Sequence, residues 1–130
     1  MNEIDQLQQR LKQFALDRDW EQFHAPNKLA MALIVEAAEL VEHFQWLTEQ
    51  QSKQLDEDKR QQVAFELADV FIYSLRLAER LDIDLLDAVE KKIVKSIHWT
   101  TINDWLKHSD IKPHKWEYWL NSNDPDFKKK

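Results

Sequence analysis

Glycine and cysteine are both missing from this chain, and proline occurs only three times. Without glycine the sequence has neither a Walker phosphate loop nor a dinucleotide-binding fingerprint, because both motifs depend on glycine backbone geometry. A bound phosphate would therefore need a metal ion and side chains. Without cysteine, a disulfide framework and thiol chemistry are excluded. Because the turn chemistry of sheets is also missing, we expect an all-α fold.

A long hydrophobic run and an excess of positive charge are missing as well. No apolar run reaches the ~18 residues that a membrane span needs, and residues 1–6 lack the basic and apolar regions of a signal peptide. We therefore expect a cytoplasmic protein without a membrane partner. The formal net charge is −6, which would repel the phosphates of a nucleic acid. We expect no nucleic-acid partner.

The 130 residues suffice for one helical domain. Apolar residues at helical spacing predict helices over 2–18 and 28–48, a third ending near residue 81 and a fourth beginning at residue 85. Asn27 is a plausible N-cap for the second helix, and either Ser52 or Asp56 could cap the third.

Two acid pairs lie inside these apolar helices. Glu36 and Glu39 are three residues apart in the second helix, and Glu66 and Asp69 repeat this spacing in the third. Residues three apart on a helix project from one face. An ion-pair ladder would place Lys or Arg one turn from each acid, but the only possible cation at those positions is His43.

Buried carboxylates without partners either take up protons or bind cations. A set of carboxylates without cysteine and without an obligatory histidine favours hard divalent ions, Mg²⁺ or Mn²⁺, over Zn²⁺. The plainer alternative is that the acids face solvent on amphipathic helices. A di-iron carboxylate bundle is disfavoured because its Glu-x-x-His pattern is missing, with Leu40 three residues before His43.

Ring side chains gather just before the first acid pair and again near the C-terminus. Trp20, Phe23 and His24 either dock onto the core or form a wall that stacks a flat ligand. Beyond His98 the chain carries four of its six tryptophans, with short helices predicted over about 101–108 and 114–121. We expect a domain over residues 1–98 and a Trp-rich extension over 99–130. The extension would pack on that domain or on a neighbouring subunit.

With the acid pairs, the aromatic segment and the helix order in hand, the sequence resembles the all-α nucleoside triphosphate pyrophosphohydrolases of the MazG superfamily. The resemblance rests on Glu36-Ala-Ala-Glu39 and Glu66-Leu-Ala-Asp69. Residues 19–26, together with Phe44-Gln45-Trp46, look like the dCTP pyrophosphatase branch. The resemblance implies a four-helix bundle-like MazG fold with extra short C-terminal helices. It also implies a homodimer or homotetramer.

The implied activity is hydrolysis of a ribo- or deoxyribonucleoside triphosphate, such as dCTP, to the monophosphate and pyrophosphate. Mg²⁺, or Mn²⁺ in its place, would neutralise charge on the phosphates. The implied metal ligands are Glu36, Glu39, Glu66 and Asp69. One acid, with Glu39 as our candidate, would orient or deprotonate the attacking water.

The implied substrate contacts lie on several predicted elements, and they are Trp20, His24, Lys28, Trp46, Tyr73 and Lys92. Tyr73 would equally suit a half-buried core position, and Lys92 a solvated basic face. A different class of function stays open, a non-catalytic helical module that presents its Trp-rich C-terminal segment to a protein partner. In that module the four acids would be idle.

Overall fold

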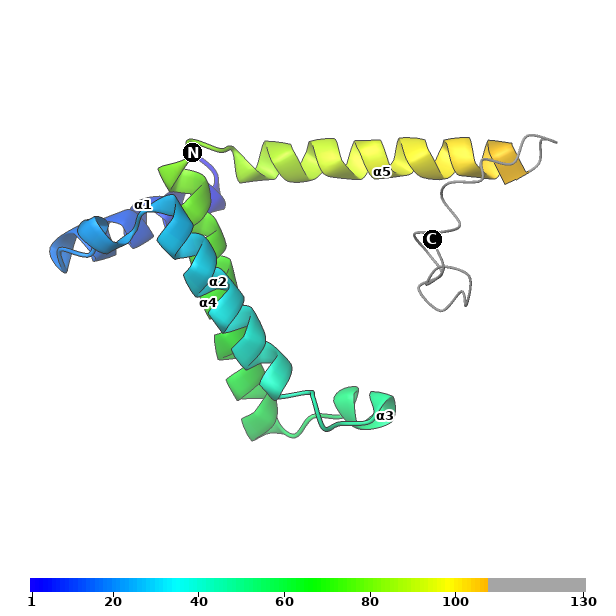
Figure 1. Ribbon diagram of the computed structural model, residues 1–130, viewed down its shortest axis with the longest axis horizontal. Coiled ribbons are helices and arrows are strands. Elements are labelled where there is room, and N and C mark those ends of the chain that lie inside the picture. The colour runs from blue at the N-terminus through cyan, green and yellow to red at the C-terminus, as the bar shows by residue number, and fades with distance from the viewer. Residues whose placement is uncertain (108–130) are drawn as a thin grey trace, which may run out of the picture. The chain divides into compact units, whose positions relative to one another are not determined.

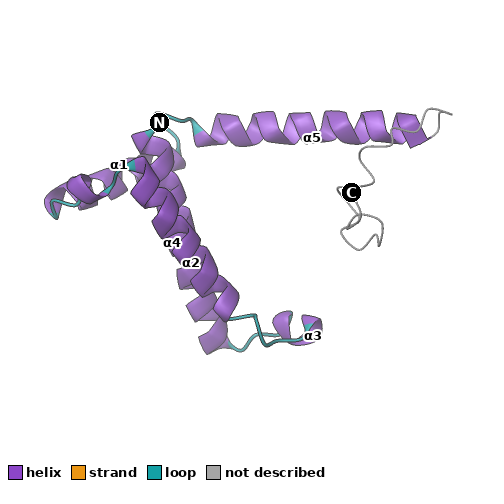
Figure 2. Ribbon diagram, viewed as in Figure 1, coloured by secondary structure: helices purple, strands orange, loops and turns teal. Residues whose placement is uncertain are grey.

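A computed structural model describes residues 1–107, with side chains up to residue 96. The chain divides into two units, Met1–Leu85 and a second that begins at Leu86. All regular structure in the described part is helical, which confirms the all-α prediction (Figure 2). In chain order, the helices are α1 (Glu3–Asp17), the 3₁₀ helix η1 (Glu21–Phe23), α2 (Pro26–Glu42), α3 (Glu49–Ser52), α4 (Glu57–Arg80) and α5 (Leu85–Lys107).

Polar side chains begin three of these helices. The Asn2 side chain accepts a hydrogen bond from the Asp5 amide at 2.8 Å and caps α1. The Asp56 carboxylate accepts from the Lys59 amide at 2.7 Å, so Asp56 is the N-cap of α4, one of its two predicted caps. α3 was not predicted from the sequence. It begins at a capping box formed by Thr48 and the glutamine three residues later.

The second helix differs from its predicted bounds. It covers Pro26–Glu42 rather than 28–48, and its N-cap is Ala25 rather than Asn27. Pro26 takes the first helical position, where its missing N–H removes no intrahelical hydrogen bond. The helix ends earlier than predicted because turns occupy residues 43–46.

Aspartate takes the place of glycine where α1 and α4 end. Asp19 has a φ of 56° and Asp82 a φ of 53°, both in the left-handed region that glycine usually occupies. After α1, the Trp20 amide donates to the Ala15 carbonyl oxygen at 2.9 Å and the Asp19 amide donates to the Leu16 carbonyl oxygen at 3.1 Å. This Schellman arrangement turns the chain at once and brings Trp20 back onto α1.

The first unit is built on an antiparallel helical hairpin. α2 and α4 lie side by side along most of their length, and α1 packs against α4 (Figure 1). Among the described residues, the buried apolar side chains come from all three helices, and they are Ala15, Leu29, Val63, Leu75 and Ala78. The Gln8 side-chain amide of α1 donates to the Leu75 carbonyl oxygen at 3.1 Å. Packing within the hairpin therefore determines which side chains of α2 and α4 face each other.

α5 belongs to the second unit and runs continuously to Lys107. Residues 101–107 continue this helix rather than forming a separate short one, and the predicted helix over 114–121 lies outside the described residues. Among the described helices, none combines the length and apolar character that a membrane crossing would require.

Leu75 tests the core at the junction of the three helices. Its side chain is 0% exposed, so Leu75→Ala should lower the free energy of unfolding by about 2–5 kcal/mol through lost burial and a residual cavity. Leu16→Ala is the matched control because Leu16 is 48% exposed, and its cost should be about 0.5 kcal/mol or less. Urea denaturation followed by circular dichroism measures both, and equal costs would contradict this core.

Candidate functional site

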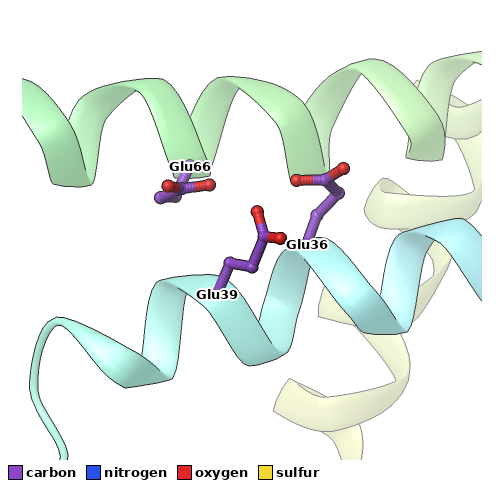
Figure 3. A group of neighbouring side chains, drawn as sticks. All are labelled: Glu36, Glu39 and Glu66. Carbon is purple, nitrogen blue, oxygen red and sulfur yellow. The ribbon is translucent and has the colours of Figure 1, made fainter.

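Three of the four predicted metal ligands come together on the facing surfaces of α2 and α4. Carboxylate oxygens of Glu36, Glu39 and Glu66 all lie within 4.8 Å of one another. Figure 3 shows Glu36 and Glu39 extending from α2 toward α4, which carries Glu66. Glu36 and Glu66 are half-buried, whereas Glu39 is exposed. The three side chains are called the acid cluster below.

Asp69, the fourth predicted ligand, borders the acid cluster without belonging to the converging set. It is half-buried, and its charge raises the pKa of Glu36. Because the hairpin is antiparallel, the later acid of α4 lies level with the earlier acid of α2. This agrees with the charges acting on Glu36, where Asp69 contributes more than Glu66 does.

Glu36 is harder to ionise than an ordinary glutamate. Burial raises the pKa of Glu36 above its ordinary value, and the charges of Glu39, Asp69 and Glu66 raise it further, as does a hydrogen bond with Glu39. In the described part of the chain, the basic side chain that contacts the acid cluster is His43, whose Nε2 atom lies 3.5 Å from Glu66 Oε1. A contact this long offsets little of the repulsion among the acids.

The donor set fits a hard divalent cation. The converging groups are all carboxylates, and they come from two packed helices. Burial raises the pKa of Glu36 most, and the neighbouring negative charges raise it further. Mg²⁺ in proteins is commonly held by a few carboxylates and by the phosphates of a substrate. Glu36, Glu39 and Glu66 would therefore hold the ion, with Asp69 adjacent to them.

A pocket of about 210 Å³ opens between α1, the segment before α2, and α4. Its lining is mostly apolar and aromatic, and it consists of Leu11, Phe14, Ala15, Trp20, His24, Ile72, Tyr73 and Arg76. The Trp20 ring packs edge-on against Phe14, with 5.6 Å between ring centroids. Trp20, His24 and Tyr73, three predicted substrate contacts, thus share one pocket of a size that suits a ring.

Tyr73 connects the pocket to the acids. It lines the pocket and lies one helical turn after Asp69 on α4. Burial raises the pKa of the Tyr73 hydroxyl, and the charges of Glu36 and Asp69 raise it further. The phenol therefore stays protonated at neutral pH and can donate a hydrogen bond at the boundary between pocket and acids.

An ion-pair network centred on Arg76 borders the pocket, and it was not predicted from the sequence. Arg76 is 3% exposed and donates to Glu21 Oε1 at 2.6 Å and to Glu79 Oε2 at 2.7 Å. Arg80 pairs with the second oxygen of Glu21. Burial acts to raise the pKa of Glu21, but the hydrogen bond and charge of Arg76 and the charge of Arg80 outweigh it and lower that pKa. An arginine within an apolar helix face was the signal available in the sequence.

Two other predicted substrate contacts of the first unit lie outside the lining of this pocket. Lys28 is exposed near the start of α2, and Trp46 is 86% exposed in the turns after α2. Lys92 is exposed on α5, which belongs to the second unit. The roles of these three residues stay predictions.

Comparison with known proteins gives consistent relatives. Residues 31–109 match the model of the MazG-like family. The chain is 40% identical over 92 residues to dCTP pyrophosphatase 1 of Homo sapiens, a match that covers 69% of this chain and 54% of that protein. The figures for dCTP pyrophosphatase 1 of Mus musculus are the same. The chain thus spans about half the length of these relatives.

A solved structure shares the fold. A crystal structure of a pyrophosphatase from Archaeoglobus fulgidus superimposes with a TM-score of 0.70 and 33% sequence identity. The match covers 74% of this chain and 90% of that chain.

Glu36 makes the stability of the protein depend on pH when divalent cations are chelated. Its pKa is higher in the folded than in the unfolded chain, so the folded chain binds this proton more tightly. The contribution of Glu36 to the free energy of unfolding therefore falls as the pH rises above the ordinary value of 4.5. In EDTA, Glu36→Gln should be more stable than wild type at about pH 7 and lose that advantage near pH 4. Urea denaturation at both pH values measures this.

The control is Glu42→Gln, which changes an exposed acid on the same helix and should gain less at neutral pH. Adding Mg²⁺ should reverse the order, because a cation that binds only the folded state stabilises the intact acid cluster more than the variant. A Glu36→Gln protein that is less stable than wild type at both pH values would contradict this account.

Proposed function

The chain belongs to the MazG-like family, and we propose that it is a metal-dependent nucleoside triphosphate pyrophosphohydrolase. It would cleave the bond between the α- and β-phosphates and release a nucleoside monophosphate and pyrophosphate. The observation that carries the proposal is the acid cluster, three carboxylates within 4.8 Å on facing helices, next to a pocket that suits a ring. The names of the human and archaeal relatives support the same activity.

The acid cluster would act on the phosphates. Bound Mg²⁺, or Mn²⁺, would neutralise charge on the phosphate oxygens and make a water molecule easier to deprotonate. The helical hairpin would hold Glu36, Glu39 and Glu66 at convergent positions against their mutual repulsion. Glu39 is the exposed member, so it is accessible to water and remains our candidate for orienting or deprotonating the nucleophile.

The pocket would hold the base. Trp20 and Tyr73 supply ring faces and His24 supplies a polar edge, while the rest of the lining is largely apolar. Tyr73 lies between the pocket and the acids, which would place the sugar near its hydroxyl. The similarity to dCTP pyrophosphatases supports a deoxyribonucleotide such as dCTP as the substrate. Lys28, Trp46 and Lys92 are proposed further contacts with the nucleotide.

The wider organisation is part of the proposal. We infer a catalytic domain over residues 1–98 and a Trp-rich extension over 99–130, in a cytoplasmic homodimer or homotetramer. The apolar outer faces of α2 and α4 support the oligomer, because a hairpin of two helices leaves them uncovered. The exposed apolar side chains there, each 43–69% exposed, are Met31, Ile34, Val35, Val41, Phe65, Leu67 and Phe71.

A screen of ribo- and deoxyribonucleoside triphosphates with Mg²⁺ tests the activity, with pyrophosphate and orthophosphate measured separately. We expect pyrophosphate from the wild type. Glu39→Ala and Asp69→Ala should each lower its release about 100-fold or more, because the acids bind the cation and activate water. Their helical circular dichroism should stay close to that of the wild type.

The matched control is Glu57→Ala, an exposed acid in the first turn of α4. It lies nine residues before Glu66, about 14 Å along the helix, and should keep wild-type turnover. Orthophosphate as the only product would point to a different bond. Wild-type turnover in Glu39→Ala and Asp69→Ala would contradict the role proposed for the acids. A wild-type protein that releases no pyrophosphate would instead favour the non-catalytic interaction module, in which the acids are idle.

Ile34 tests the proposed oligomer interface. It is 69% exposed in the single chain, so Ile34→Glu should place a charge in the interface and convert the oligomer to a monomer by light scattering. Leu16→Glu is the control, since Leu16 is also exposed but lies on α1. A wild-type protein that is monomeric at all concentrations would contradict the interface and leave the chemistry untouched.

A further inference from the structure

The segment between α1 and α2 is fastened to α4 by charge. Glu21 accepts from two arginines that are one turn apart on α4: Arg76 Nη2 donates to Oε1 at 2.6 Å, and Arg80 Nη1 donates to Oε2. The same arginines reach His24, because Arg80 Nε donates to the His24 carbonyl oxygen at 3.0 Å and Arg76 Nη2 lies 3.3 Å from the ring Nδ1. Glu21, Arg76 and Arg80 are called the arginine clamp below.

The arginine clamp holds the part of the pocket that no long helix supports. Trp20 directly precedes Glu21, and His24 ends the 3₁₀ turn that follows. Both rings line the pocket. Side chains on a short connecting segment keep a fixed position only when contacts outside the segment hold them. Here α1 supplies contacts to Trp20. The helix α4, which also carries Glu66 and Asp69, supplies them to Glu21 and His24.

The contact from Arg76 also decides which nitrogen of His24 carries the proton. A guanidinium group has donors and no acceptor, so Nδ1 of His24 must accept the hydrogen bond. A neutral imidazole that accepts at Nδ1 carries its proton on Nε2. Burial lowers the pKa of His24, and the charge of Arg76 lowers it further, so the ring is neutral at neutral pH. His24 therefore has an N–H donor left for a ligand.

We propose that the arginine clamp positions the ring-binding wall of the pocket and that Arg76 fixes His24 as an Nε2–H donor for the bound ring. The ligand class is then a heteroaromatic ring with a carbonyl oxygen or ring nitrogen as acceptor, which in the proposed function is the nucleobase. That identification rests on the proposed function, whereas the clamp and the tautomer are properties of the protein alone. Arg76 and Arg80 are positioning residues, because they act through Trp20 and His24.

Nuclear magnetic resonance of the full chain tests the tautomer without any substrate. Long-range proton–nitrogen correlation spectra, with His24→Asn used to assign the ring, should show the proton on Nε2 in the wild type. Arg76→Met removes the donor at similar volume and should give a mixture of tautomers. A wild-type ring protonated on Nδ1 at neutral pH, or no change in Arg76→Met, would overturn the assignment.

Steady-state kinetics test the positioning role. Glu21→Gln weakens both arginine contacts while Arg76 keeps its pairing with Glu79, so this variant should fold even if Arg76→Met does not. We expect KM to rise about fivefold or more, the change that loss of a charge-assisted hydrogen bond gives, and kcat to stay within about twofold. Glu49→Gln is the matched control, because it removes an exposed ion pair with Lys53 on α3 and should change neither constant.

The outcomes separate the two proposals. Unchanged KM in Glu21→Gln, or a fall in kcat without a rise in KM, would overturn the positioning role. A wild-type protein that hydrolyses no nucleoside triphosphate would overturn the proposed function alone. In that case the spectra still decide the tautomer, since the assignment requires the Nε2–H form in the wild type and a tautomer mixture in Arg76→Met.

Discussion

The first unit holds several carboxylates close together against their mutual repulsion, and this is the main physical constraint on its structure. Glu36, Glu39 and Glu66 converge within 4.8 Å, with Asp69 beside them, and the pKa of Glu36 is raised by burial and by its neighbours. The repulsion among these charges opposes this arrangement. It persists because α2 and α4 pack along their length, so burial of apolar side chains such as Leu29 and Val63 opposes the electrostatic cost.

The two charge clusters of this unit are built on opposite principles. Behind the pocket, the buried Arg76 meets Glu21 and Glu79 in hydrogen-bonded pairs, so negative charge there is compensated within the chain. In the acid cluster the described residues offer His43 alone, at 3.5 Å from Glu66. Compensated charge serves to hold structure, whereas uncompensated charge on facing helices favours a cation from solution. The difference in charge compensation therefore supports a positioning role for the arginine clamp and a proposed cation site at the acid cluster.

The helical class could be predicted from the sequence, and so could the shared face of each acid pair, because acid spacing within one helix depends only on the helical repeat. The approach of Glu66 to Glu36 and Glu39 could not, because it depends on how α2 and α4 pack. The sequence placed α2 poorly, since the preference of Pro26 for the first helical position outweighed the capping signal of Asn27. It could not show the clamp, because Glu21 and Arg76 are far apart in the chain and surface pairs and buried pairs look alike in a sequence. Pairing across elements needs the packed hairpin.

The absence of glycine shapes the chemistry as well as the fold. Where α1 ends, Asp19 adopts the left-handed conformation that glycine usually supplies, and the turn it makes places Trp20 on the pocket. Because the chain has no glycine loop, the proposed function would assign phosphate recognition and ring recognition to separate parts of the site. Triphosphate binding would then require a divalent cation, and ring selection would depend on the pocket wall. Tyr73 links the two parts. It lines the pocket, and burial together with the charges of Glu36 and Asp69 raises the pKa of its hydroxyl.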